Sequence, residues 1–294
     1  MRFVKVEGAG NDYVLIEEFD REIDDPAELS RQISSRHCGV GSDGLLLVGP
    51  AGEEAAVRMR IFNADGSEGM MCGNGLRCVV RYLVETGRLS GAEGTEVDVQ
   101  TASGIRRARL GVSGAVEVDM GVPSFVPDSL PCDLPGDGTR PAKHPLPVGL
   151  ENGVDGAYAV SVGNPHLVLR VDEVKTFDLG RHATALQASP RLGQGANIHG
   201  VQVAGDNSLI VRPWERGSGA TQACGTGAVA VAAVACALGW IKSEPVRTQV
   251  NIEMPGGSLG VRLESTGAAW LSGPARLVFV GEWPMPESTA GQTT

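Results

Sequence analysis

Two cysteines in this sequence lie in closely similar glycine-rich contexts. Cys72 begins the stretch Cys-Gly-Asn-Gly, and Cys224 begins the stretch Cys-Gly-Thr-Gly. A thiol at the N-terminus of a helix meets the positive end of the helix dipole and free backbone N–H groups, which lower the pKa of a thiol from about 8.5. Two such thiols on opposite faces of one carbon could remove one proton and return another, which would invert that centre.

The residues that follow each cysteine could bind an anion. In both stretches two glycines flank one polar residue, Asn74 or Thr226, and glycines leave the backbone N–H groups accessible to a carboxylate. The same N–H groups would stabilise the negative charge that develops when a proton is removed next to that carboxylate. In the reverse direction the two thiols exchange roles, so their titration belongs to the pair.

An internal repeat explains how two such stretches arise. Each cysteine is followed 15 positions later by a glycine, Gly87 or Gly239, which suits a helix that begins at the cysteine and ends at that glycine. The two cysteines are 152 positions apart, and nine residues before each lies Asn63 or Glu215. Further equivalent pairs are Arg60 with Arg212, and Gly10–Asn11 with Gly163–Asn164. Two duplicated halves are the simplest interpretation.

Alternating apolar stretches separated by glycine turns surround the predicted helix of each half, and this pattern is typical of strands. Seven prolines between Pro123 and Pro147 favour an extended segment that crosses from one half to the other. We predict an α+β fold of two pseudo-symmetric mixed β domains, each wrapped around a central helix, with the active site in the cleft between them. The domains would be residues 1–121 and 122–273.

Length and composition exclude several classes of protein. The chain has 294 residues, a net charge of −10 and no long basic segment, so nucleic acid and anionic membranes are not expected partners. The most apolar run, Ala228–Leu238, is shorter than the roughly 20 residues of a membrane span. The N-terminus lacks the apolar core of a signal peptide. We expect a cytoplasmic protein that acts on a small molecule, with no membrane partner.

The cysteine spacing and the glycine motifs predict neither a metal nor a cofactor. The six cysteines include no Cys-x-x-Cys pair, so a zinc knuckle and a disulfide framework are not indicated. The stretch 39–44 has the spelling of a dinucleotide fingerprint, but a strand-like apolar run follows it instead of a helix. The stretch 217–224 lacks the Gly-Lys-Ser/Thr ending of a phosphate-binding loop. We predict that the protein uses no cofactor.

Several segments, in order and across almost the whole chain, resemble the diaminopimelate epimerase family. They are GAGNDYV from Gly8, FNADGSEGMMCGNGLRC from Phe62, VGNPH from Val162 and WERGSGATQACGTGA from Trp214. The resemblance implies two pseudo-symmetric halves, with residues 274–294 completing the first. It also implies interconversion of LL- and meso-2,6-diaminopimelate, a step toward lysine and peptidoglycan, without pyridoxal phosphate or metal, and a possible homodimer.

The same resemblance assigns roles to individual residues. Cys72 and Cys224 would be the acid/base pair, and His166 would support the site. The residues at the reacting centre and its carboxylate would be Asn11, Gly73, Asn74, Gly225 and Thr226. Those that bind the distal amino acid end would be Asn63, Asn164, Asn197, Glu215 and Arg216. An arginine offers a planar fork to a carboxylate, and a glutamate can accept from an ammonium group.

Two positions depart from the pattern of many relatives. Gly44 stands where some carry a glutamine directed toward the substrate, and Ala220 stands where a glutamate is frequent before the second cysteine. Both bear on specificity rather than on the reaction. A racemase of another amino acid on the same fold is therefore an alternative.

Two alternatives from other classes are a thiol redox protein and a non-catalytic amino acid binding module. If Cys72 and Cys224 exist to form a disulfide, oxidation should activate the protein, whereas it should inactivate an epimerase. A binding module would hold its ligand without exchanging hydrogen with solvent. Taken singly, a cysteine is most often a packed core residue, and an asparagine that follows a glycine is most often a turn former.

Overall fold

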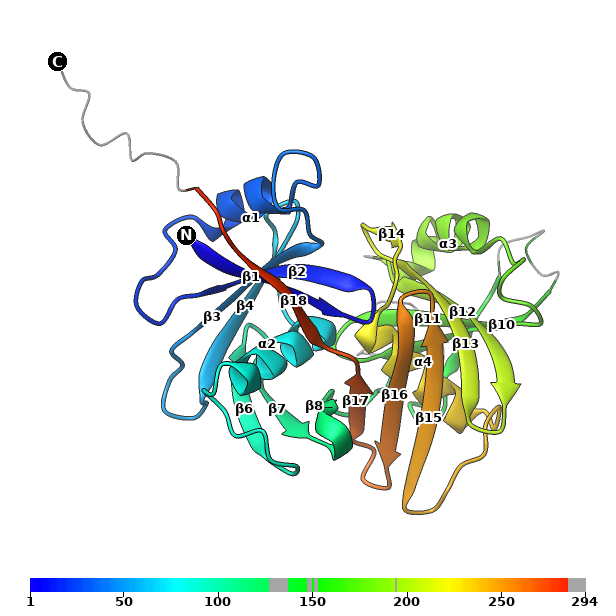
Figure 1. Cartoon of the computed structure of the whole chain (residues 1–294). Coiled ribbons are helices and arrows are strands. Elements are labelled where there is room, and N and C mark those ends of the chain that lie inside the picture. Colours follow the sequence, from blue (N-terminus) through cyan, green and yellow to red (C-terminus); the bar gives the residue numbers. More distant parts are fainter. Residues whose placement is uncertain (127–136, 147–149, 151–152, 194, 285–294) are drawn as a thin grey trace.

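The computed structural model describes residues 1–126, 137–146, 150, 153–193 and 195–284. Cys132, part of the proline-rich segment and the last residues of the predicted 274–294 extension lie outside the described residues. The chain forms two lobes, with the strands up to residue 119 and the last strand (276–282) in one, and the strands between residues 142 and 273 in the other (Figure 1).

The first lobe is built on a sheet in the order β18–β1–β2–β3–β4–β6–β7–β8. Two neighbouring pairs, β2–β3 and β4–β6, are parallel, and the others are antiparallel. The strands are β1 (Arg2–Gly8), β2 (Asn11–Glu17), β3 (Gly44–Gly49), β4 (Val57–Asn63), β5 (Glu68–Gly69), β6 (Glu96–Thr101), β7 (Gly104–Leu110), β8 (Val116–Asp119) and β18 (Arg276–Glu282).

The second lobe repeats this order as β9–β10–β11–β12–β13–β15–β16–β17. Its parallel pairs, β11–β12 and β13–β15, fall at the equivalent places. The strands are β9 (Ala142–His144), β10 (Val154–Ser161), β11 (Pro165–Val171), β12 (Asn197–Gly205), β13 (Ser208–Glu215), β14 (Gly219–Ala220), β15 (Arg247–Met254), β16 (Gly257–Glu264) and β17 (Ala269–Gly273). The predicted fold class of two pseudo-symmetric mixed β halves is confirmed.

Each lobe wraps its sheet around one central helix, α2 (Gly73–Glu85) or α4 (Gly225–Ala237). Both helices are largely buried, and both end where the sequence predicts, because Gly87 (φ 73°) and Gly239 (φ 69°) adopt the left-handed conformation after the last turn. No helix among the described residues combines the length and the apolar character that crossing a membrane requires.

A second, shorter helix packs on the outer face of each sheet, α1 (Pro26–Ser34) or α3 (Leu179–Gln187). Strand β3 is buried on both faces. Because side chains alternate along a strand, its successive residues contact two different clusters. Leu45 and Leu47 contact the cluster under α1, whereas Leu46 and Val48 belong to the main core around α2. Two short 3-10 turns also lie among the described residues, at Val112–Gly114 and Pro190–Leu192.

The chain crosses between the lobes twice. After β8 it enters the second lobe, where β9 pairs with β10. After β17 it returns, and β18 pairs antiparallel with β1, seen as the red strand that runs back over the blue and cyan lobe (Figure 1). The strands that precede the crossings, β8 and β17, pair with each other, so the two sheets are continuous.

Candidate active site

The two repeated cysteines occupy equivalent positions at the starts of the two central helices. Cys72 is the N-cap of α2, and its Sγ accepts the backbone N–H of Gly75 at 3.3 Å. Cys224 is the N-cap of α4, and its Sγ accepts the N–H of Gly227 at 3.3 Å. Both thiols therefore lie where the helix dipole and free N–H groups favour a negative charge.

The starts of these helices meet at the junction of the two lobes. A Cβ atom placed on Gly225 would lie 3.4 Å from Asn74 Oδ1 and 3.9 Å from Gly73 Cα. Leu271 Cδ2 fills the space between them, 3.0 Å from a Cβ position on Gly73 and 2.9 Å from one on Gly225. Glycine at both positions is thus what lets the two helix starts approach each other.

A cavity of about 720 Å³ opens at this junction and is lined from both lobes. Ten of the thirteen residues that the sequence singles out line it, and both cysteines are among the ten. Those ten are Asn11, Asn63, Cys72, Gly73, Asn74, Asn164, Glu215, Cys224, Gly225 and Thr226. Residues as far apart in sequence as Asn11 and Thr226 thereby surround one space large enough for a small amino acid.

The other three predicted residues lie behind or beside the cavity lining. His166 is buried and bridges Asn164 Oδ1, at 2.8 Å from its Nε2, and His199 Nε2, at 2.9 Å from its Nδ1. Asn197 is buried, and its Oδ1 accepts the backbone N–H of Arg216 at 2.9 Å. The side chain of Arg216 is exposed. His166 therefore holds Asn164, and Asn197 holds the backbone that carries Arg216.

On the side of the first lobe a hydrogen-bonded chain reaches the α2 start. Asn74 Nδ2 donates to Asn11 Oδ1 at 2.6 Å, and Asn11 Nδ2 donates to Asp43 Oδ2 at 3.1 Å. Asp43 in turn pairs with Arg36 at 2.8 Å. Asn74 Oδ1 is buried and has no hydrogen-bond partner among the described residues. An acceptor is thus fixed next to the helix start, where a substrate donor could use it.

On the side of the second lobe the polar side chains form separate hydrogen-bonded pairs instead of one chain. Asn164 Nδ2 donates to Thr226 Oγ1 at 3.5 Å, and Thr221 Oγ1 donates to Glu215 Oε1 at 2.6 Å. Across the cavity Asn63 is exposed, and its Nδ2 donates to Ser67 Oγ at 2.9 Å. Glu215 and Asn63, equivalent by the repeat, thus reach the same cavity from opposite lobes.

Burial controls the protonation of the second lobe's site. Burial raises the pKa of the Cys224 thiol well above its usual value, and the nearby Glu215 carboxylate adds to the effect. Burial also lowers the pKa of His166 well below its usual value and that of His199 to about 3, so both rings are neutral at pH 7. His166 can therefore orient Asn164, but it is not a base that titrates near neutrality.

The sequence reasoning missed two residues that contact the site. The Tyr13 hydroxyl lies 3.2 Å from Cys72 Sγ, and Asp43 anchors Asn11. Tyr13 looks like an ordinary residue of an apolar strand, and Asp43 like a residue of a glycine turn. Because Asn11 and Tyr13 are two positions apart on β2, a period-2 reading of that strand would have placed both on one face.

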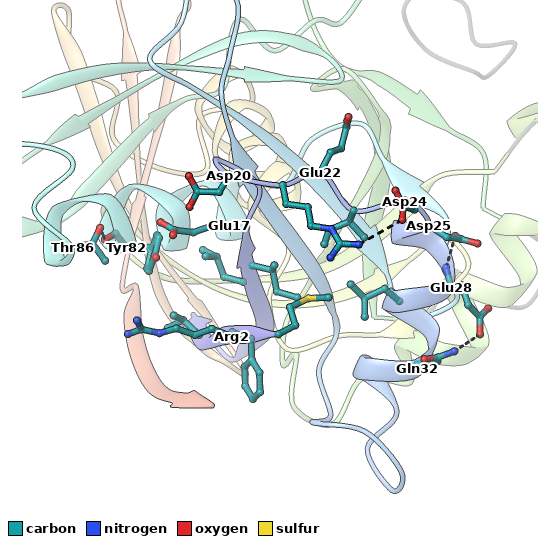
Figure 2. Close-up of a pocket in the computed structure, with 18 of the residues that line it drawn as sticks. Arg2, Glu17, Asp20, Glu22, Asp24, Asp25, Glu28, Gln32, Tyr82 and Thr86 are labelled. Carbon is teal, nitrogen blue, oxygen red and sulfur yellow. Dashed lines mark hydrogen bonds and ion pairs between the residues drawn. The ribbon is translucent and has the colours of Figure 1, made fainter. Parts of the chain in front are cut away.

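A second, larger cavity lies in the first lobe, against α1 and the N-terminal strand (Figure 2). Its volume is about 850 Å³, and none of the thirteen predicted residues lines it. Figure 2 shows acidic side chains around it, among them Glu17, Asp20, Glu22, Asp24, Asp25 and Glu28. Since it contains no thiol, the chemistry that the repeat predicts belongs to the smaller cavity.

Comparison with known proteins agrees with this geometry. The profile of the family described as diaminopimelate epimerase matches residues 3–126 and 158–278, which include both helix starts. The chain belongs to the diaminopimelate epimerase family. The predicted amino acid epimerase, an isomerase, is thereby confirmed at the level of the family.

Relatives named diaminopimelate epimerase cover nearly the full length. The chain is 40% identical to the protein of Desulfovibrio desulfuricans, over 96% of this chain and 98% of the relative. It is 37% identical to that of Bacillus subtilis, over 95% and 97%. Each of these relatives is matched from one lobe through the other, so family membership applies to the whole two-lobed chain.

Solved structures share the fold at much lower identity. A PhzF-family phenazine biosynthesis protein of Bacillus anthracis superposes with a TM-score of 0.71 at 17% identity, covering 97% of this chain and 99% of that chain. A hydroxyproline epimerase of Agrobacterium vitis superposes with a TM-score of 0.64 at 17% identity, covering 96% and 90%. The fold of this epimerase family member is therefore shared by proteins of several names.

The two positions at which the sequence predicts a departure from many relatives, Gly44 and Ala220, differ in their surroundings. Gly44 lies in β3 opposite Tyr13, and a Cβ atom there would meet the Phe62 carbonyl oxygen at 2.3 Å. Ala220 is exposed and lines the cavity beside the cysteines. The backbone at Gly44 therefore leaves no room for a side chain, whereas position 220 can accept a larger one.

Proposed function

We propose that this protein interconverts LL- and meso-2,6-diaminopimelate by proton transfer between two cysteines, without a cofactor. The observation that carries the proposal is the pair of equivalent thiols, Cys72 and Cys224, at two helix starts that line one cavity. The names of the full-length relatives support diaminopimelate as the substrate.

In the proposed step one cysteine is a thiolate and the other a thiol. The thiolate takes the α-hydrogen as a proton, the C–H electron pair stays on the substrate carbon, and the thiol gives its proton to the opposite face of that carbon. The centre is inverted, and the pair is left with its single proton on the first sulfur. Exchange with water then restores the starting arrangement, so no oxidant or other co-reactant is needed.

The helix starts would stabilise the carbanion-like transition state. The backbone N–H groups at Gly73, Asn74, Gly225 and Thr226 would bind the carboxylate on the reacting carbon, where negative charge develops. Asn11 lies beside this position, held by Asp43.

The distal amino acid end of the substrate would be bound on the opposite side of the cavity. Glu215 would accept from the distal ammonium, and Arg216 would offer its guanidinium to the distal carboxylate. The amides assigned to the same end are Asn63, Asn164 and Asn197.

Solvent hydrogen exchange tests the proposal directly. The protein, dialysed against a chelator and free of added pyridoxal phosphate, is incubated with LL-diaminopimelate in deuterated water, beside a panel of other L- and D-amino acids. We expect deuterium at the α-carbon of diaminopimelate together with formation of the meso isomer. Exchange with another amino acid instead would support the racemase alternative, and binding without exchange would support a binding module.

Thiol chemistry separates the proposal from a redox function. The described cysteines, including Cys72 and Cys224, are all free. An epimerase of this kind should lose activity when a disulfide oxidant is added and regain it with a thiol reductant. Activity that appears only after oxidation would contradict the proposed mechanism.

The proposal includes a homodimer in the cytoplasm. Strand β18 lies at the edge of its sheet, and Val278, Phe279 and Val280 on it are 53%, 48% and 54% exposed. Unpaired edge strands with exposed apolar side chains favour association. Light scattering after size-exclusion chromatography should give twice the chain mass, and a single-chain mass would contradict this part of the proposal.

A further inference from the structure

The two thiols are equivalent by the repeat, but their hydrogen-bond partners are not. Tyr13 is 5% exposed, and its hydroxyl lies 3.2 Å from Cys72 Sγ with no other partner among the described residues. Its equivalent in the second lobe is His166, which contacts Asn164 and His199 instead of Cys224. Cys72 therefore has a phenol beside it that Cys224 lacks.

A buried cation also lies on the side of Cys72. Arg77 in α2 is fully buried, and none of its three guanidinium nitrogens has a hydrogen-bond partner among the described residues. Its equivalent in α4 is the apolar Val229. Burial lowers the pKa of Arg77, but a guanidinium stays protonated at neutral pH. An unpaired buried charge is costly unless an anion lies within reach.

The ionisable groups that face Arg77 are Cys72 and Cys78 on its own helix, Tyr13 on β2 and Glu7 on β1. Burial raises the pKa of Cys78 to about 12, so that thiol is neutral. Burial, followed by the charge of Cys72, raises the pKa of Tyr13 well above 10, so the phenol keeps its proton and acts as a hydrogen-bond donor.

The carboxylates near this group are already paired. Glu7 binds Arg276 at 2.8 Å and accepts the backbone N–H of Gly10 at 2.6 Å. Asp43, which faces Tyr13, binds Arg36. Among these described groups, Cys72 is the one left that can supply an anion to Arg77.

The surroundings of Cys224 have the opposite effect. Its side chain is buried, and the carboxylate of Glu215 lies near its sulfur, so a negative charge there is disfavoured. Its Sγ lies 3.5 Å from Thr226 Oγ1, a longer contact than the one that Tyr13 makes with Cys72. The neutral rings of His166 and His199 add no positive charge.

We propose that Tyr13 and Arg77 are positioning residues that keep Cys72 as the thiolate of the resting enzyme, with Cys224 as the thiol. The proposal rests on the two-cysteine reaction above and adds which sulfur begins it. The stereoisomer whose α-hydrogen faces Cys72 is deprotonated by the resting enzyme. The other stereoisomer reacts with the form in which the proton has moved to Cys72.

Alkylation resolved by cysteine tests this assignment on the full-length protein without substrate. Iodoacetamide labelling of Cys72 and Cys224 is followed by peptide mass spectrometry between pH 5 and 10. Each rate is divided by the rate of the same cysteine at pH 10, which removes the difference in access between the two sites. We expect a larger normalised rate at pH 7 for Cys72 than for Cys224.

The decisive variant is Tyr13→Phe, which removes the hydroxyl and keeps the ring. We expect the normalised labelling of Cys72 at pH 7 to fall about tenfold, the effect of losing one hydrogen bond to a charged group, while Cys224 is unchanged. Tyr82→Phe is the matched control, because Tyr82 is a buried tyrosine of the same lobe whose hydroxyl faces Glu17. It should leave both labelling profiles as they are.

Arg77→Leu gives a second, independent measurement and should lower the labelling of Cys72 in the same direction. Thermal unfolding of each variant shows whether it is folded. Faster normalised labelling of Cys224 in the parent protein, or a Tyr13→Phe profile that matches the parent, would overturn the assignment. If α-hydrogen exchange is absent while Cys72 still shows the larger normalised labelling rate, the proposed function is overturned and the thiol asymmetry stays intact.

Discussion

The two lobes place the same helix start in the same order of strands, yet they surround it with different side chains. Position by position, Tyr13 corresponds to His166, Arg77 to Val229 and Asn63 to Glu215. In the first two pairs the first member favours an anion at the neighbouring sulfur and the second gives no such support. In the third pair Asn63 is uncharged, whereas Glu215 disfavours an anion at Cys224. The duplicated fold therefore supplies the geometry of a two-sided site, and a few substitutions make its sides unequal.

A similar contrast exists one strand further out. Tyr13 lies opposite Gly44 across the parallel pair β2–β3, and His166 lies opposite Asn197 across the equivalent pair β11–β12. Asn197 holds the backbone of Arg216, whereas the Phe62 carbonyl oxygen excludes any side chain at position 44. The residues proposed to bind the distal end of the substrate thus come mainly from the second lobe.

The largest expected effect comes from removing either thiol, because the proposed inversion needs both. Cys72→Ala and Cys224→Ala should each lower the rate of epimerisation by about 10²- to 10⁴-fold, the range for a general acid or base. The rate of conversion of LL- to meso-diaminopimelate measures this. Cys78→Ala is the control, since Cys78 is buried in the body of α2. Full activity in either thiol variant would remove the basis for comparing the two sides.

Alanine at the third position of each central helix should affect the two lobes differently. A Cβ on Gly227 would meet His199 Cε1 at 2.4 Å, whereas one on Gly75 would meet Leu46 Cδ2, the flexible end of a side chain, at 2.9 Å. Gly227→Ala should cost about 1–3 kcal/mol of unfolding free energy, as overpacking does. Gly75→Ala should cost less. Equal costs in urea unfolding would show that the two helix starts are packed alike.

Acid should weaken the second lobe first. Folding lowers the pKa of His199 from 6.5 to about 3, so the unfolded chain binds a proton that the folded chain does not as pH falls below 6.5. The resulting loss is about 2 kcal/mol by pH 5. The first lobe's one histidine, His37, is exposed. Hydrogen exchange at pH 7 and 5 should show earlier loss of protection in β11 and β12 than in β2 and β3, and parallel loss would contradict this.

The smallest expected effects concern the equivalent arginines Arg60 and Arg212. Arg60 forms a partly exposed ion pair with Glu68 at 2.9 Å, so Arg60→Ala should cost at most about 1 kcal/mol. Arg212 donates to the carbonyl oxygens of Val174 and Phe177 at 3.1 and 3.0 Å, ahead of α3. Arg212→Ala should cost about 1–3 kcal/mol because buried acceptors lose their donor. Thermal unfolding of both variants compares them, and a costlier Arg60→Ala would reverse the order.

Features that depend on local sequence were predictable. The repeat, the helix starts at the two cysteines and their ends at Gly87 and Gly239 follow from residue types and spacing, and the structure confirms them. The outer helices α1 and α3 were not predicted, although Asp25 and Asp178 cap their starts as sequence rules allow. Nine-residue helices carry too short a periodic pattern to stand out.

Features that depend on contacts between distant segments were not predictable from one sequence. The contact between Tyr13 and Cys72 joins residues 59 positions apart. Arg77 can be recognised only in the folded core, where its guanidinium has no hydrogen-bond partner among the described residues. The sequence could place Tyr13 on a strand and Arg77 on a helix. Only the packing of that strand against that helix places both side chains near Cys72.

The exchange of strands between the lobes has a consequence for biosynthesis. A ribosome releases β1 through β8 long before it makes β18, yet β18 is the strand that covers the outer edge of β1. The first lobe therefore has an unpaired sheet edge at β1 during the time in which the ribosome synthesises every strand of the second lobe. Nascent chains of this protein should need shielding of that edge until the final strand docks.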